Sequence, residues 1–111
     1  MQHKTIAFVS ILFISLITAS APIMADNQQT LNAIAAKAMT AQRNFDYQTA
    51  LKLWRSAAEK GDPNAQYHLG KMYQLGQGVT QSDSVAKAWY RLAAASGHNI
   101  AQAKLETLQH H

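Results

Sequence analysis

Apolar residues recur from about residue 30 onwards with the spacing of one helix face. In the stretch from Ala58 to Ala94, small and large apolar side chains stand four, seven and eight positions apart, which places them on one side of an α-helix. Small residues allow two helices to approach closely, while aromatic rings fill the space between them. The pattern therefore predicts a helical hairpin. Its expected inward residues are Ala65, Leu69, Met72 and Tyr73 in one helix and Ala86, Trp89, Tyr90, Ala93 and Ala94 in the other.

The same period predicts three more helices, at about residues 30–43, 47–60 and 99–109. No window alternates with a period of two, so no strand is expected. Phe45 stands directly before Asp46, in the position of a staple residue beside a helix cap. The sequence thus predicts an all-α chain of about five helices. The expected inward residues of these three helices are Leu31, Ile34, Ala35 and Ala38, then Ala50, Leu53, Trp54, Ala57 and Ala58, and last Ala101, Leu105 and Leu108.

The turn between two of these helices is encoded locally by Gly61, Asp62 and Pro63. A glycine can take the left-handed conformation that ends a helix, an aspartate can accept from the free N–H groups of the next helix, and proline suits its first position. We therefore expect Gly61 to have a positive φ and Asp62 to cap the helix that follows.

An internal repeat appears at an offset of 36 residues, because the segment Ala50 to Leu69 shares nine positions with Ala86 to Leu105, Trp54 to Tyr90 being the one aromatic exchange. The central unit shows a longer motif, made up of Ala65, Leu69, Gly70, Tyr73, Gly76, Gly78, Val79, Lys87, Ala88, Trp89, Tyr90, Ala93, Ala94 and Gly97. In these residues the chain resembles the Sel-one-like repeat family, a branch of the tetratricopeptide-like solenoids.

The resemblance implies a short right-handed α/α solenoid of antiparallel hairpins, with about two repeats and a C-terminal capping helix in residues 26–111. Only the middle unit carries the full motif: the first lacks the Gly-x-Gly loop, and the last stops after one helix. The family implies adaptor and interaction roles in bacterial envelopes, signalling and host contact. We therefore expect a module that binds a protein or peptide partner. A dedicated inhibitor, such as an immunity protein that blocks a toxin, is the first alternative, and a small enzyme or ligand-binding protein is the second.

A binding face can be located by subtracting the core, because residues opposite the buried face of each helix are free to meet a partner. In solenoids of this type the first helix of each hairpin lines the concave side. Tyr67 is the one aromatic residue expected there, and exposed tyrosines are common binding anchors. The alternative is that Tyr67 packs on a neighbouring helix. The predicted partner-binding residues are Lys37, Thr40, Tyr67, Lys71 and Gln74, with Ala33, Ala103, Thr107 and His110 in the same rows.

The first 25 residues have the pattern of an export signal: Lys4 in a short basic start, an apolar run from Ile6 to Ile17, and then small residues up to Ala25. We expect cleavage after Ala25 and a periplasmic or secreted chain that has no stable membrane insertion. The alternative is an uncleaved anchor in the inner membrane.

Charge and candidate chemistry add little to this picture. From Asp26 onwards nine basic residues stand against six acidic ones, spread evenly rather than in a patch, which argues against nucleic-acid binding. The chain has no cysteine, and neither His68 nor His98 has an acidic partner at ligand spacing, so we expect solvated histidines and no metal. No nucleophile, base or carboxylate pair is evident, and we expect no cofactor and no enzymatic activity. The sequence leaves the oligomeric state open.

Overall fold

The computed structural model describes residues 27–110, and the chain divides between Thr30 and Leu31 into two units. Of the first unit only residues 27–30 are described, and they are helical. The predicted signal segment, residues 1–25, lies outside the described residues. In the second unit the opening helix continues to residue 43 and is followed by α2 (Tyr47–Glu59), α3 (Pro63–Leu75), α4 (Asp83–Ala95) and α5 (Asn99–Gln109). Throughout residues 27–110 the regular structure is helical, which confirms the predicted all-α class.

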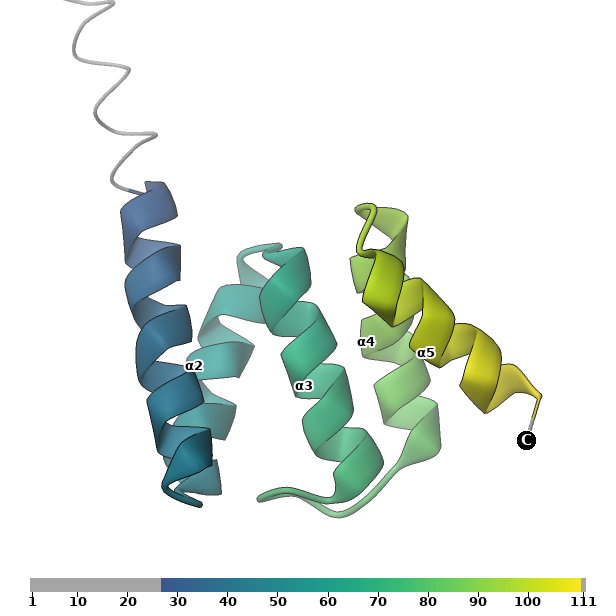
Figure 1. Ribbon diagram of the computed structural model, residues 1–111, viewed down its shortest axis with the longest axis horizontal. Coiled ribbons are helices and arrows are strands. Elements are labelled where there is room, and N and C mark those ends of the chain that lie inside the picture. Colours follow the sequence, from purple (N-terminus) through teal and green to yellow (C-terminus); the bar gives the residue numbers. More distant parts are fainter. Residues whose placement is uncertain (1–26, 111) are drawn as a thin grey trace, which may run out of the picture. The chain divides into compact units, whose positions relative to one another are not determined.

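Within the second unit each helix packs against the helix that follows it, so the elements form antiparallel hairpins (Figure 1). The opening helix, α3 and α5 lie nearer the viewer, and α2 and α4 lie behind them. The opening helix and α2 form the first hairpin, while α3 and α4 form the second. Helix α5 packs on α4 and, within residues 27–110, has no partner helix following it. This arrangement places α3 against both α2 of the first hairpin and its own partner α4.

The turn after α2 has the predicted conformation, since Gly61 has φ = 91° and the Asp62 carboxylate accepts from the Asn64 N–H at 3.1 Å. The backbone N–H groups of Gly61 and Asp62 donate to Ala58 and Ala57 at 3.0 and 3.2 Å, which completes a Schellman motif. The same motif follows α4, where Gly97 has φ = 90°. The two helices end alike because the sequence repeats the glycine.

The core consists mainly of alanines around a few large side chains, as the small-and-large pattern predicts. Trp54, Leu69, Met72 and Tyr90 are its largest fully buried members. Trp89 is only partly buried, and it packs against the cluster that includes Trp54. The prediction that Trp54 and Tyr90 face inward is therefore confirmed.

Some details of the prediction were wrong. Phe45 is 77% exposed and its ring meets the Tyr47 ring edge-on, so it is not buried as a staple. Its φ of 61° lies in the left-handed region and belongs to the tight turn before α2. In α2, Leu53 is partly buried against the core as predicted, but the buried Leu51 was not predicted. Gln66 is also buried, which the pattern of apolar residues could not indicate, and its Nε2 donates to the Ala58 carbonyl at 3.2 Å.

Candidate functional site

A cleft of about 260 Å³ opens between the first helix and α3. We call it the cationic cleft; it is lined by Met39, Gln42, Arg43, His68 and Lys71. The first helix contributes three of these side chains from its last two turns, and α3 contributes two from its middle. The cleft therefore exists only because two helices that belong to different hairpins lie side by side.

The two charged residues of the cleft are held by neighbouring groups. A guanidinium nitrogen of Arg43 donates to Thr40 Oγ1 at 3.1 Å, one turn earlier in the same helix. The Lys71 Nζ lies 5.8 Å from the centre of the Tyr67 ring, within the range of a cation–π contact. Arg43 has five N–H donors and lysine three, so each retains donors beyond these contacts. No acidic side chain is among the residues that line the cleft.

His68 forms part of the cleft wall and is not the solvated residue that the sequence suggested. Its ring stacks on Trp54 with centroids 4.2 Å apart and planes 9° apart. Burial, followed by the charges of Lys71 and His98, lowers the pKa of His68 to about 4, so the ring is neutral at neutral pH. The positive charge of the cleft therefore comes from Arg43 and Lys71 alone.

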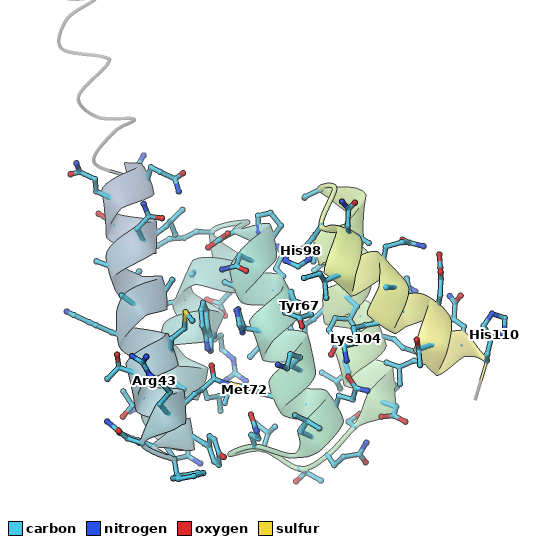
Figure 2. The ribbon with its side chains drawn as sticks, viewed as in Figure 1. Arg43, Tyr67, Met72, His98, Lys104 and His110 are labelled. Carbon is cyan, nitrogen blue, oxygen red and sulfur yellow. The ribbon has the colours of Figure 1, made fainter. Side chains whose placement is uncertain are left out.

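An aromatic cluster joins α3 to α5 beside the cleft. Tyr67 stacks on His98 with ring centroids 4.7 Å apart and lies 6.0 Å from the Tyr90 ring. His98 is also not simply solvated, because its Nδ1 accepts from the Ala101 N–H at 3.2 Å and so caps α5. In Figure 2 the side chains of Tyr67, His98 and Lys104 lie between α3 and α5. Burial raises the pKa of the Tyr67 phenol.

The five predicted partner-binding residues do not share one setting, since only Lys71 lines the cationic cleft. Tyr67 is partly buried where α3 packs on α4 and α5, which agrees with the alternative that it packs on a neighbouring helix. Gln74 is half-buried and accepts from the Tyr90 hydroxyl at 2.7 Å. Lys37 and Thr40 are exposed on the first helix, and Thr40 donates to the Ala36 carbonyl at 3.0 Å. The role of all five residues in binding stays a prediction.

Four of the five residues that line the cleft were not predicted from the sequence as binding residues: Met39, Gln42, Arg43 and His68. For Gln42 the sequence did contain a signal, namely its correspondence to Gln74. Each glutamine stands near the end of the first helix of its hairpin. Gln42 accepts from the Trp54 indole at 2.8 Å just as Gln74 accepts from Tyr90. Met39 and Arg43 carry no such signal, because nothing in a single helix indicates which flank its neighbour leaves open.

The described residues hold little reactive chemistry. Among residues 27–110 no three histidine, aspartate or glutamate side chains gather as a metal site. Burial, with Tyr67 and Asp83 nearby, raises the pKa of Tyr90, so its hydroxyl stays protonated and donates to Gln74. Within the same range no helix is long and apolar enough to cross a membrane. The cleft and its surroundings are suited to recognising a partner by charge and shape.

Helical hairpins that repeat along the chain, joined by Schellman turns, define an α/α repeat protein of the tetratricopeptide-like class. The model of the Sel1 repeat matches residues 41–62 and 63–98, more than half of the chain. The protein belongs to the Sel1 repeat family, whose repeats generally mediate protein–protein interactions. The predicted family is therefore confirmed.

Two curated relatives are similar over 69 residues of this chain. They are the proteins named DAP3-binding cell death enhancer 1 from Rattus norvegicus, 38% identical, and from Mus musculus, 39% identical. Each match covers 62% of this chain but only 14% of the relative. The likeness is thus to a repeat segment within a much longer protein.

Proposed function

We propose that the protein is an exported interaction module that binds a protein or peptide partner in the bacterial cell envelope. The observation that carries the proposal is the cationic cleft, an open recess lined by Arg43 and Lys71 on a scaffold of the Sel1 repeat family. The module acts by binding, and we propose no catalytic role for it. Lys37 and Thr40 are exposed on the helix that supplies Arg43, and they extend the proposed surface.

The proposed compartment rests on the N-terminal sequence alone, because the curated relatives are mammalian proteins. If residues 1–25 are an export signal, the protein released by osmotic shock should have the intact mass of a chain that begins at Asp26. A chain that retains Met1 in the membrane fraction would instead support the anchor.

Site-specific photo-crosslinking tests the binding surface. The full chain is produced in a bacterial host with a photoreactive residue in place of Thr40 or Lys71, and in place of Lys52 as a matched control. Lys52 is an exposed residue of α2, outside the lining of the cleft. We expect one discrete adduct from the first two positions and none from Lys52. Adducts from Lys52 alone would show that the partner binds the face formed by α2 and not the cleft.

A further inference from the structure

We propose that the cationic cleft binds acidic peptide segments, taking a carboxylate between Arg43 and Lys71 with an apolar neighbour beside Met39. This inference rests on the proposed function, because it names the chemistry of the partner that the interaction surface accepts.

The cleft presents two positive charges from opposite walls, Arg43 from the first helix and Lys71 from α3. A carboxylate has two oxygens and accepts hydrogen bonds from an arginine and a lysine at once, and such charge-assisted bonds are among the strongest in proteins. The third polar wall residue, Gln42, directs its carbonyl oxygen to the Trp54 indole at 2.8 Å. The neutral ring of His68 stacks on that same indole and adds no third charge. The cleft therefore matches one anionic group.

The five acidic residues within residues 27–110 are occupied elsewhere or lie outside the cleft. Asp46 and Asp62 cap α2 and α3, and Asp83 accepts from the Gln81 amide at 2.8 Å. Glu106 accepts from the Gln102 amide at 3.0 Å, and Glu59 is exposed at the end of α2. Within residues 27–110 no carboxylate lines the recess, so an incoming one meets no internal competitor.

The size and rim of the recess favour a peptide over a larger anion. Pockets for drug-sized ligands occupy about 300–1,000 Å³, whereas this cleft of about 260 Å³ is open and suits one or two side chains. Met39 is 48% exposed at the rim, and flexible methionines adapt to varied apolar groups. An acidic residue followed by an apolar one satisfies both features.

Fluorescence anisotropy with two labelled eight-residue peptides tests the inference. One peptide carries four glutamates and two leucines, and in the other each glutamate is replaced by glutamine. We expect the full chain to bind the glutamate peptide at least about tenfold more tightly, the loss expected from removing one charge-assisted contact. Equal affinity for the two peptides, or no binding of either, would overturn the proposal.

Charge-matched variants locate the site. Arg43→Gln with Lys71→Gln should weaken binding of the glutamate peptide about tenfold or more. Lys87→Gln with Arg91→Gln removes one lysine and one arginine from α4, outside the cleft lining, and should leave affinity within about twofold. Circular dichroism verifies that both variants fold. As a second measurement, the peptide should shift the backbone amide resonances of Met39 and His68.

Equal losses in the two variants would show unspecific charge attraction and would sink the idea, as would a single-stranded oligonucleotide that binds as tightly as the glutamate peptide. Competition separates this inference from the proposed function. If the adduct formed from Thr40 persists in excess glutamate peptide, the interaction module stands and the acidic-peptide inference fails. If the peptide binds the cleft and no adduct forms, the reverse holds.

Discussion

The first hairpin, residues 31–60, and the second, residues 63–96, each join a glutamine near the end of one helix to an aromatic ring of the next. The Trp54 indole donates to Gln42 at 2.8 Å, and the Tyr90 hydroxyl donates to Gln74 at 2.7 Å. Both rings are fully buried. The hairpins differ at the position four residues before each glutamine, which is Ala38 in the first and Gly70 in the second. A tryptophan and a tyrosine thus make the same kind of contact in the two hairpins.

The two hairpins differ more on their outward faces than in their interiors. Four positions of α2 that are exposed or half-exposed are polar, and the four that stand 36 residues later in α4 are apolar and exposed. These positions are Thr49, Lys52, Ser56 and Glu59 in α2 and Val85, Ala88, Leu92 and Ala95 in α4. The repeat therefore specifies how helices pack, whereas surface residues vary between units. None of the residues that line the cationic cleft is among the positions shared between the repeats.

The largest effect is expected at Gly70. A Cβ there would lie 2.7 Å from Tyr90 Cε1 and 3.3 Å from the Ala86 carbonyl. Gly70→Val should therefore lower the free energy of unfolding by about 3 kcal/mol, as expected for overpacking in a core. Chemical denaturation measures the change. The control Ala88→Val places the same side chain on the exposed face of α4 and should change stability by less than about 0.5 kcal/mol. An unchanged free energy of unfolding in Gly70→Val would mean that α3 and α4 pack less closely than the structure shows.

The next effect tests whether the two glutamine contacts are equivalent. Gln42→Met and Gln74→Met keep the side-chain length but remove the acceptor, leaving the donor of a buried Trp54 or Tyr90 without its partner. Each should lower the free energy of unfolding by about 2 kcal/mol. A loss in only one variant would show that water replaces the acceptor in the other hairpin and would break the comparison.

The fold was predictable from the sequence because its determinants are local. The helix spacing, the glycine at each Schellman turn and the cap at Asp62 act within a few residues, and they placed α5 at its observed bounds. The cleft was not predictable because its walls come from helices of different hairpins, and Met39 lies outside both matched repeats. The buried position of Gln66 likewise depends on the end of α2 rather than on its own helix.

A smaller effect should be equal at the two turns. Gly61 and Gly97 have φ near 90°, and a Cβ at either would have no heavy atom within 4 Å outside its chain neighbours. Gly61→Ala and Gly97→Ala therefore test backbone strain alone, and each should cost about 1 kcal/mol. In a domain of this size that lowers the melting temperature by roughly 4–8 °C. Clearly unequal shifts would indicate that the two turns do not carry the same strain.

The smallest expected effect is a pH dependence of stability that arises where His68 packs on the first hairpin. His68 stacks on Trp54 of the first hairpin, and its pKa of about 4 lies below the ordinary value of 6.5. As the pH falls, this histidine is therefore protonated in the unfolded chain before it is protonated in the folded one. The stability that the neutral ring contributes is present above pH 6.5 and is lost as the pH falls towards 4. Lys71 and His98 face this ring, and Arg43 lines the same cleft, so an added charge finds no compensation. The melting temperature should fall between pH 7 and 5.5, above the range in which ordinary carboxylates titrate. His68→Phe keeps an aromatic ring against Trp54 without a titrating group, so its melting temperature should fall less over this interval. An equally steep fall in the variant would show that His68 is not the group responsible.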